Sequence, residues 1–386
     1  MSEPAHEPRV MHVDDQAGWR GGEQQMLYLA EGLARRSIPT GAVLQSGGPA
    51  AREAQKAGIE VFELPMRGEL DLVAAWRIAR LARAGRFNIL HSHTAHAHTL
   101  ILLAAGLFRA RCRVVVHRRI EFPVGRSAFG LGRLKYRFGV DAFIAISNRV
   151  KETLMDAGVP EWKVFVVRSA TDPQRFINAA VSPGLRASLG IPEDAFVVGN
   201  VGALVGHKDH GALLEACRIV RGAIPRTWVV IVGEGPLRES IVNAARRLHM
   251  LDRLVMTGFR WDVPQLIRMF DVFALSSSEE GMCSALLEAA AAGCPVVATD
   301  AGGVREAVLP GETGTVVPVR NPQALAEGIL EAAHKPERAR TMAERGRERV
   351  LKKFNADALT GQTLEVYRRV LSGEVGADRP VGFLGD

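Results

Sequence analysis

The sequence lacks the features that would place it in a membrane, in a secretory pathway or in a disulfide-bonded scaffold. None of its apolar runs approaches the ~20 residues that a membrane-spanning helix needs. The opening residues, MSEPAHEPRV, carry Pro, Glu and His where a signal peptide has a basic patch followed by an apolar core. The four cysteines show no C-x-x-C spacing, which indicates neither a disulfide framework nor a zinc site. We therefore expect a cytoplasmic protein.

Common nucleotide-binding and catalytic motifs are also missing or incomplete. The nearest match to the dinucleotide motif G-x-G-x-x-G, at 232–239, has only Gly233 and Gly235. The stretch 201–210 fails as a P-loop because its glycines are one residue too close and a histidine precedes its lysine. Neither a G-x-S-x-G elbow nor a D-x-D after a strand is present. Four histidines straddle a strand end and a helix start, so we expect no metal site at His91, His93, His96 and His98.

The sequence does contain short β-branched or aromatic runs that alternate with helix-like segments, which is typical of parallel sheets covered by helices on both faces. One set of strands is predicted at 9–13, 41–45, 59–64, 88–91, 113–116, 142–146 and 164–167. A second set is predicted at 196–201, 228–232, 254–257, 272–276, 295–298 and 315–317. Between the two sets, 171–194 has three prolines and no strand-like run, which indicates an interdomain linker.

The chain of 386 residues is long enough for two domains of ordinary size. We predict an α/β fold with two Rossmann-like, doubly wound parallel-sheet domains that face one another across a cleft. The first domain is assigned to 1–175 and the second to 190–355. A C-terminal helix at 356–370 is expected to pack back on the first domain, and the Gly-rich, aperiodic 371–386 is expected to be a mobile tail.

The net charge of +7 is concentrated in the first half of the chain. Residues 1–170 hold 24 Lys and Arg against 16 Asp and Glu, whereas residues 171–386 hold 25 against 26. Within 109–137, nine basic residues accompany a single acid, Glu121. Such a stretch is either a solvated basic face or a surface for an anionic partner, and the sequence leaves both open.

The most informative segment is 271–308, where a strand ends in serines and a helix rich in Ala and Leu begins near Ser284. A helix N-terminus presents free backbone N–H groups and a positive dipole end, which suit a phosphate or diphosphate. Glu280 and Glu288 flank this position. Because carboxylates repel a diphosphate, the two acids are better suited to sugar hydroxyls or an electron-poor carbon. Alternatively, Glu280 is a loop acid and Glu288 only complements the helix dipole.

This segment resembles the family-4 retaining glycosyltransferases of the GT-B fold, because Glu280, Gly281 and Glu288 match their E-G-x-x-x-x-x-x-E pattern and AAAAGCPVVATDAGGVREAV follows. Other segments resemble the family's loops in their usual order and extend the likeness over most of the chain. They are WRGGEQQMLYLAEGL at 19–33, VVVHRR at 114–119, VGALVGHKDHGALLEA at 201–216, VGEGPL at 232–237 and TGFRWDVPQLI at 257–267.

The resemblance implies that the C-terminal domain binds a nucleotide-sugar donor, with UDP or GDP, and that the N-terminal domain binds the acceptor. Glu280 would face the donor sugar, Lys208 would neutralise the diphosphate, and Glu288 would bind the ribose hydroxyls. His117 would lie near the reacting centre. Further donor-binding positions are Gly21 and Gly22 in the N-terminal loop, Gly281, Met282, Cys283 and Ser284 at the helix start, and the loops at Gly235 and Phe259.

The resemblance also implies front-face transfer with retention, in which the departing phosphate accepts the acceptor's proton and no protein nucleophile, cofactor or metal is required. Two positions depart from the family. Ala203 stands where the family commonly has a second diphosphate-binding arginine, a charge that Arg20 or Arg305 could supply. Met282 replaces a bulky aromatic, which we expect to tune the sugar pocket. A transfer-inactive nucleotide-sugar-binding protein and a nucleotide-sugar epimerase are the alternative functions.

The acceptor is predicted to be a saccharide or a lipid-linked molecule of cell-envelope glycan synthesis, such as lipopolysaccharide. Aromatic residues interleave with cations in 109–137, which suits an anionic membrane surface at the inner face of the cytoplasmic membrane. The predicted patch consists of Arg118, Arg119, Arg126, Arg133, Lys135 and Arg137. The alternative is a surface for a phosphorylated saccharide, with the aromatics in the core. No nucleic-acid partner is expected, because the aromatics lack a stacking-module motif.

Overall fold

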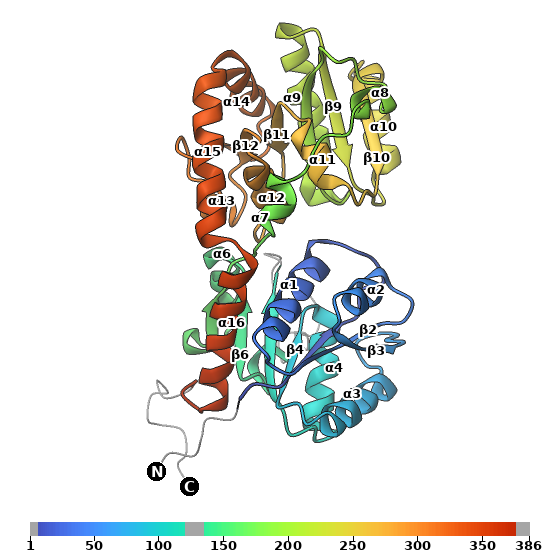
Figure 1. Cartoon of the computed structure of the whole chain (residues 1–386), viewed down its shortest axis with the longest axis vertical. Helices are drawn as coiled ribbons and strands as arrows, with labels where there is room; N and C mark the ends of the chain where they lie inside the picture. Colours follow the sequence, from blue (N-terminus) through green and yellow to red (C-terminus); the bar gives the residue numbers. More distant parts are fainter. Residues whose placement is uncertain (1–6, 120–134, 376–386) are drawn as a thin grey trace. The chain divides into compact units, whose positions relative to one another are not determined.

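The computed structural model describes residues 7–119 and 135–375, and the chain divides into two compact units. The first unit contains the chain up to Ser169 together with the part from Ala356 onward, and the second contains Ala170–Asn355. Each unit is a parallel sheet with helices packed on it (Figure 1). In the described ranges, no helix combines the length and the apolar character needed to cross a lipid bilayer.

The sheet of the first unit has seven parallel strands in the order β3-β2-β1-β4-β5-β6-β7. They are β1 (Val10–Asp14), β2 (Thr40–Gln45), β3 (Glu60–Leu64), β4 (Ile89–Ser92), β5 (Arg113–Arg118), β6 (Ala142–Ala145) and β7 (Val164–Val166). The helices are α1 (Gly21–Arg35), α2 (Pro49–Lys56), α3 (Leu72–Ala84), α4 (Ala95–Gly106), α6 (Asn148–Asp156), α16 (Ala356–Leu371) and the short η1 (Glu161–Lys163). Side chains cap the N-termini of several helices: the Asp71 carboxylate accepts a hydrogen bond from the Ala74 N–H at α3, and the Thr94 hydroxyl accepts one from the Ala97 N–H at α4.

The sheet of the second unit has six parallel strands in the order β10-β9-β8-β11-β12-β13. They are β8 (Phe196–Val201), β9 (Thr227–Val232), β10 (Leu254–Gly258), β11 (Val272–Leu275), β12 (Val296–Thr299) and β13 (Thr315–Val317). The helices are α7 (Pro173–Ile177), α8 (Leu185–Ser188), α9 (His210–Ala223), α10 (Arg238–Arg247), α11 (Val263–Arg268), α12 (Ser284–Ala292), α13 (Val304–Ala307), α14 (Pro322–His334), α15 (Pro336–Lys353), η2 (Gly206–Lys208) and η3 (Leu251–Arg253). Its strands read as near-continuous apolar runs because helices cover them, as the fully buried Val198, Val229 and Ile231 illustrate.

In both sheets the strand order reverses beside the first strand. β1 pairs with β2 on one side and β4 on the other, and β8 pairs with β9 and β11 in the same way. Ligands of such sheets bind at the carboxyl ends of the strands around this reversal. The loops that follow β1, β4 and β5 in the first unit, and β8, β9 and β11 in the second, are therefore the places where a site is expected.

Each of the predicted strands is present, which confirms two doubly wound parallel-sheet domains. The linker predicted at 171–194 is wrong, because this segment belongs to the second unit. Its first proline, Pro173, begins α7 behind the capping side chain of Asp172, and α7 packs on α12. Arg186 of α8 donates to the carbonyl of Met269 at 3.0 Å. Proline thus starts a packed helix here instead of marking a free connection.

The C-terminal helix α16 packs along α1 in the first unit. The two helices approach closely at Gly32, where an added Cβ would lie 2.9 Å from the Cβ of Thr360. Tyr367 of α16 is fully buried, and its hydroxyl lies 2.6 Å from Nδ1 of His91 on β4. Residues 376–386 of the predicted tail lie outside the described residues.

Candidate active site

Lys208 and Glu280 form a buried ion pair beyond the carboxyl ends of β8 and β11. Lys208 Nζ lies 2.6 Å from Glu280 Oε1, and the two side chains are 15% and 8% exposed. The Ser277 hydroxyl donates to the same carboxylate oxygen at 2.7 Å. Burial alone would lower the pKa of Lys208, but the Cys283 thiolate that forms at high pH and the Glu280 carboxylate outweigh burial and hold this pKa above the usual lysine value. Lys208 is therefore a fixed positive charge at neutral pH.

The two loops that carry this pair are joined by hydrogen bonds to the backbone. The Ser276 hydroxyl donates to the carbonyl of Lys208 at 2.8 Å, and the Ser278 N–H donates to the carbonyl of His207 at 2.8 Å. Asp209 follows with a φ of 46°, in the left-handed region, and its side chain accepts from the Ala212 N–H to begin α9. These contacts fix where Lys208 stands relative to β11.

Helix α12 begins directly after the loop that carries Glu280. Its N-terminal boundary residue, Cys283, makes no side-chain cap hydrogen bond within the described structure. Burial raises the pKa of the Cys283 thiol to about 11, so the thiol is neutral and adds no negative charge at this helix end. Burial also raises the pKa of the partly buried Glu288 to about 7, against the opposing charge of Arg175. Lys208, Glu280 and the N-terminus of α12 therefore lie together, and Glu288 follows within the same helix.

Close backbone contacts explain the glycines of the neighbouring loops. An added Cβ at Gly235 would lie 2.5 Å from the carbonyl oxygen of Leu204. Gly233 has a φ of 141°, and an added Cβ there would overlap the carbonyl of Gly202. The Leu204 N–H in turn donates to the carbonyl of Glu234 at 2.9 Å. These glycines therefore serve to pack the loops after β8 and β9 against each other.

Two aromatic rings stand at the end of β10. Phe259 packs edge-on against Trp261 with ring centroids 5.0 Å apart, and both rings remain exposed.

Two arginines could supply the charge that is missing at Ala203. Of these, Arg305 is paired with Asp300 at 2.8 Å on the surface of the second unit. Arg20 belongs to the first unit, at the start of α1.

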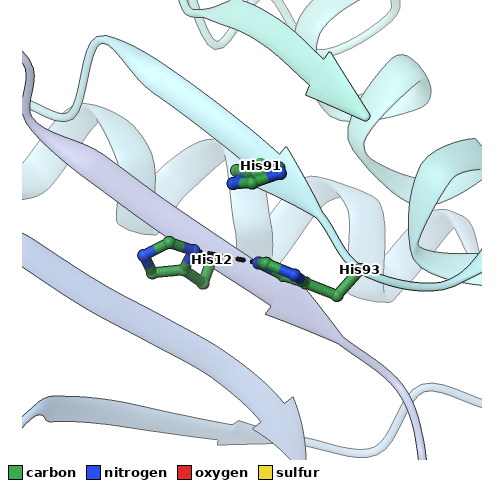
Figure 2. Close-up of side chains that lie close together, drawn as sticks. All are labelled: His12, His91 and His93. Atoms are coloured by element: carbon green, nitrogen blue, oxygen red, sulfur yellow. Dashed lines mark hydrogen bonds between the residues drawn. The ribbon is translucent and has the colours of Figure 1, made fainter. Parts of the chain in front are cut away.

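In the first unit, His117 ends β5 as one of a group of buried histidines around Arg119. Arg119 Nη2 lies 2.9 Å from Nδ1 of His93 and 3.4 Å from Nδ1 of His117. Nδ1 of His12 lies 3.0 Å from Nε2 of His93 (Figure 2). The His91 and His117 rings are stacked, with centroids 5.6 Å apart. Burial, followed by the charge of Arg119, holds the pKa of His117 well below its usual value.

Two buried carboxyl groups accompany Arg119. Burial, reinforced by the charge of Glu23, raises the pKa of Asp14 to about 7. Burial raises the pKa of Glu23 as well, although its carboxylate accepts from the Arg20 N–H at 2.5 Å and so caps α1. Gly22 lies next to the Arg119 side chain, since an added Cβ would be 3.7 Å from Arg119 Cδ, an ordinary van der Waals contact. The glycine start of α1 and the end of β5 are thus neighbours.

Three of the four described members of the predicted basic patch make contacts within the first unit. Arg119 is enclosed by the histidines, and Arg118 donates to the hydroxyl of the buried Tyr136 at 3.1 Å. Lys135 donates to the carbonyl of Ala95 at 3.0 Å and also reaches Glu69. Arg137 is exposed, while Arg126 and Arg133 lie outside the described residues. Arg118 and Arg119 make internal contacts because they stand at and just after the end of β5, at the carboxyl edge of the sheet, and the patch as a whole stays a prediction.

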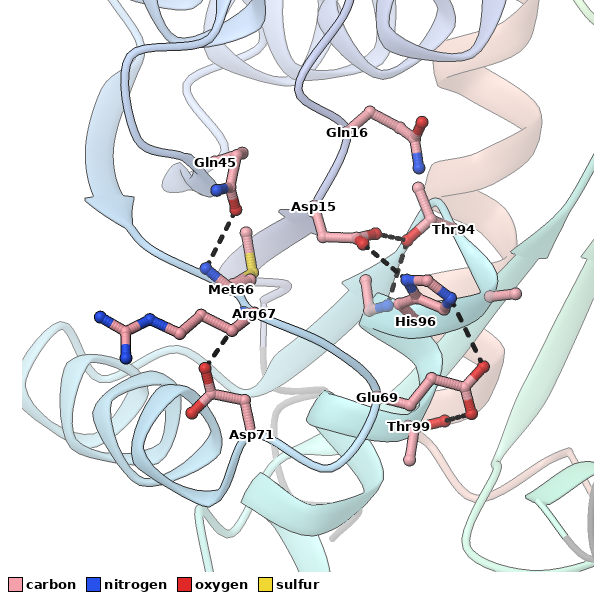
Figure 3. A network of polar contacts seen from close by, with 12 residues as sticks. Asp15, Gln16, Gln45, Met66, Arg67, Glu69, Asp71, Thr94, His96 and Thr99 are labelled. Atoms are coloured by element: carbon pink, nitrogen blue, oxygen red, sulfur yellow. Dashed lines mark hydrogen bonds and ion pairs between the residues drawn. The ribbon is translucent and has the colours of Figure 1, made fainter.

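A second polar network lies beside this group, at the ends of β1 and β4 (Figure 3). Asp15 accepts from the hydroxyl of Thr94 and lies 3.1 Å from Nδ1 of His96. His96 Nε2 lies 3.7 Å from Glu69, which also accepts from Lys135 at 3.3 Å. The side chains of His96 and Glu69 are about half exposed, whereas that of Asp15 is 8% exposed.

His12, His91 and His93 are the one group in the described chain with ligand atoms close enough for a metal ion. The group does not fit one. A metal on Nε2 of His93 would require a proton on Nδ1, and that nitrogen already faces the Arg119 guanidinium, which can only donate. Metal-bound histidines instead direct their second N–H at an acceptor. The expected lack of a metal requirement stays a prediction.

Sequence reasoning missed Asp14, Glu23 and His12, and placed Arg119 on the wrong kind of surface. Asp14 and His12 lie on β1, the strand beside which the strand order reverses. The sequence was therefore enough to place them near the end of a strand. Their contact with Arg119 was not readable, because it depends on β1, β4 and β5 lying side by side in the sheet.

Comparison with known proteins identifies the class. Residues 19–175 match the family described as Glycosyltransferase Family 4, and residues 182–349 match the family described as Glycosyl transferases group 1. The chain therefore belongs to the family-4 glycosyltransferases, and its two parallel-sheet units have the GT-B fold.

Particular relatives cover most of the chain. It is 26% identical over 350 residues to the lipopolysaccharide core biosynthesis glycosyltransferase LpsE of Rhizobium meliloti, covering 90% of this chain and 95% of LpsE. It is 31% identical over 267 residues to a GDP-mannose-dependent alpha-(1-6)-phosphatidylinositol monomannoside mannosyltransferase of Mycolicibacterium smegmatis, covering 65% and 69%. The structure of Anabaena Alr3699/HepE in complex with UDP and glucose superposes with a TM-score of 0.81 at 22% identity, covering 93% and 99%.

Proposed function

We propose that this glycosyltransferase moves a sugar, with retention, from a UDP- or GDP-sugar to a saccharide or lipid-linked acceptor of cell-envelope glycan synthesis. The observation that carries the proposal is the Lys208–Glu280 pair, which places a fixed cation and a carboxylate beside the N-terminus of α12. Relatives named for lipopolysaccharide core synthesis and for a phosphatidylinositol mannoside support the envelope and lipid parts of the proposal.

In the proposed reaction, the bond between the sugar's anomeric carbon and the diphosphate oxygen breaks while the acceptor oxygen bonds to that carbon on the same face. The acceptor's proton passes to the departing phosphate. Lys208 and the backbone N–H groups at the N-terminus of α12 stabilise the negative charge that develops on the diphosphate. Glu280 faces the sugar and Glu288 binds the ribose hydroxyls, and His117 is proposed as the substrate-binding residue of the first unit. The loops at Gly235 and Phe259 line the base and sugar pocket.

The decisive experiment incubates the full chain with UDP- and GDP-sugars, with and without a lipid extract, and measures nucleotide release together with sugar identity. We expect nucleotide release that depends on the acceptor. Tight donor binding without turnover would instead identify a transfer-inactive binding protein, the alternative to which the missing arginine at Ala203 points. A changed sugar without added acceptor would identify an epimerase.

Metal removal provides a separate prediction. Because Lys208 and the α12 N-terminus supply the positive potential that a cation would otherwise provide, we expect turnover to survive EDTA treatment unchanged. The measurement is the initial rate of nucleotide release before and after chelation, with Mg²⁺ added back as the control. A rate that falls with EDTA and returns with Mg²⁺ would contradict a metal-independent mechanism.

We propose that the start of α3 is a membrane-facing surface of the first unit, in addition to the patch predicted from the sequence. Leu70 is 76% exposed and Trp76 is 42% exposed, and Leu72 and Val73 between them are exposed as well. The buried face of α3 is formed by other residues, including Ala75 and Ile78. The exposed apolar residues therefore have no part in the core of the first unit.

Arginines frame these apolar side chains. Arg80 lies over the Trp76 ring at 5.7 Å, and Arg67 and Arg77 line a hollow of about 460 Å³ beside Leu70. Arg83, near the end of α3, donates to the carbonyl of Phe108 at 2.6 Å and joins the helix to the loop of the exposed Arg109. Apolar side chains among arginines suit a bilayer that contains anionic lipid. The Asp15–His96–Glu69 network follows the same sheet edge and is proposed to bind acceptor hydroxyls.

Vesicle binding tests this surface. We expect the full chain to sediment with vesicles of phosphatidylglycerol and phosphatidylcholine, and much less with phosphatidylcholine alone. Trp76→Glu should weaken binding strongly, and Arg77→Gln should weaken it roughly fivefold, at about 1 kcal/mol per arginine. Leu251→Glu, a similarly exposed apolar position in the second unit, is the matched control and should bind normally. Equal binding by Trp76→Glu and the wild type would refute the surface.

A further inference from the structure

Arg119 controls which ring nitrogen carries the proton in three of the buried histidines. A guanidinium has N–H donors and no acceptor, so each ring nitrogen that it contacts must offer a lone pair. Arg119 Nη2 contacts Nδ1 of His93 at 2.9 Å and Nδ1 of His117 at 3.4 Å. If both rings are neutral, both must carry their proton on Nε2.

The neutrality of these rings follows from their surroundings. His12, His93 and His117 are buried, and burial lowers the pKa of each, to about 3 in His12. The charged neighbour common to all three is Arg119, which disfavours a second positive charge. Burial lowers the pKa of Arg119 itself to about 10, and Asp14 and Glu23 act against that change, so the guanidinium stays charged at neutral pH.

The proton assignment then passes along the group. His93 carries its proton on Nε2 and therefore donates to Nδ1 of His12, 3.0 Å away. His12 must in turn carry its proton on Nε2. Nδ1 of His91 lies 2.6 Å from the Tyr367 hydroxyl. His91 therefore does not compete with His93 and His117 for the N–H groups of Arg119. Arg119, just after the end of β5, thus fixes the proton positions of rings that stand at the ends of the neighbouring strands β1, β4 and β5.

The proton assignment leaves two of these rings with an N–H group that has no acceptor in the described part of the chain. Within the described residues, Nε2 of His117 and Nε2 of His12 are buried without a hydrogen-bond partner. A buried N–H without a partner costs free energy, and a catalytic or binding role is one of the explanations for such a group in a native structure. The His117 N–H is therefore available to an oxygen atom of a bound substrate.

We propose that Arg119 is a positioning residue that fixes His117 as an Nε2–H donor, so that His117 hydrogen-bonds a substrate oxygen and does not act as a general base. The catalytic part of this inference rests on the proposed function, whereas the proton assignment does not. It agrees with a mechanism in which the departing phosphate, and not a histidine, takes the acceptor's proton.

Nitrogen NMR of the full chain with ¹⁵N-labelled histidine tests the assignment without any need for activity. We expect His93, His117 and His12 to show the Nε2–H pattern, unchanged between pH 5.5 and pH 8. An Nδ1–H pattern at His93 or His117, or a titration of either ring in that range, overturns the inference. In Arg119→Met, the His117 ring should lose its fixed pattern; an unaltered pattern also overturns it.

Kinetics separate a positioning role from a merely structural one. If the chain transfers sugar, Arg119→Met should lower kcat at least about tenfold, because a mixture of tautomers replaces the correct donor, while the donor KM changes little. Arg119→Lys keeps one charged donor and should recover part of kcat if the variant is folded. Arg35→Met, at an exposed arginine of α1, is the matched control. Fixed tautomers in a chain without transfer would contradict the proposed function alone; an unchanged kcat in Arg119→Met would contradict the positioning role.

Discussion

Lys208→Ala is expected to lower turnover roughly 100-fold or more, as the loss of a preorganised electrostatic stabiliser typically does. Lys208 Nζ is held 2.6 Å from Glu280, and its side chain is 15% exposed. Because little water reaches this position, solvent cannot replace the positive charge that the variant loses. Charge develops on the diphosphate mainly in the transition state, and the loss should therefore appear in kcat more than in donor affinity. Steady-state rates of nucleotide release, with donor binding measured by calorimetry, give both quantities.

Two variants sharpen this prediction. Lys335→Ala removes an exposed lysine of the same unit that pairs with Glu331 and should leave turnover unchanged. Lys208→Arg keeps the charge with a different shape and should lie between Lys208→Ala and the wild type. A kcat for Lys208→Ala equal to that of the wild type, in a protein with an unaltered thermal transition, would remove Lys208 from the mechanism.

Glu280→Ala is expected to impair both activity and stability, because it leaves the buried Lys208 ammonium without its carboxylate. Removing one partner of a buried ion pair typically lowers the free energy of unfolding by about 3–5 kcal/mol. The Ser277 hydroxyl would lose its acceptor as well. Urea unfolding of the full chain measures the effect, and Glu312→Ala, at an exposed acid of the same unit, serves as the control.

A double-mutant cycle shows whether the pair acts as a unit. If the penalty of Glu280→Ala is the unpaired lysine charge, adding Lys208→Ala should recover about 1 kcal/mol or more of the loss. Turnover should not recover, since both groups are proposed to act on the donor. Strictly additive losses of stability would mean that the two side chains are held independently and that their ion pair contributes little.

The sequence predicted the strands well and some of the connections poorly. Apolar runs such as FVVGNV at 196–201 are bounded by turns and buried on both sides, so composition alone locates them. The prolines of 171–194 indicated a linker, yet Pro173 opens α7, because proline is equally suited to the first turn of a helix. Distinguishing the two requires knowing that α7 packs on α12.

The second-unit site was readable because its parts lie close together in the chain or in a recognisable order. Glu280, Cys283 and Glu288 fall within one loop and helix, and the lysine follows the first strand of the same sheet. The Arg119 group was not readable, since His12, His93 and His117 come from three strands that only the order β1-β4-β5 brings together. The same arginine looked like part of a basic surface because sequence does not report burial.

The sequence by itself determined that this chain folds as two doubly wound domains and carries the glutamates, lysine and glycine loops of a glycosyltransferase. Local patterns suffice for this, because strand burial, helix starts and loop glycines are each decided within a few residues. The tertiary structure alone decided which charges face inward. Burial and pairing depend on neighbours distant in sequence, and these made Lys208 and Arg119 fixed interior cations while leaving Trp76 and its arginines on the surface.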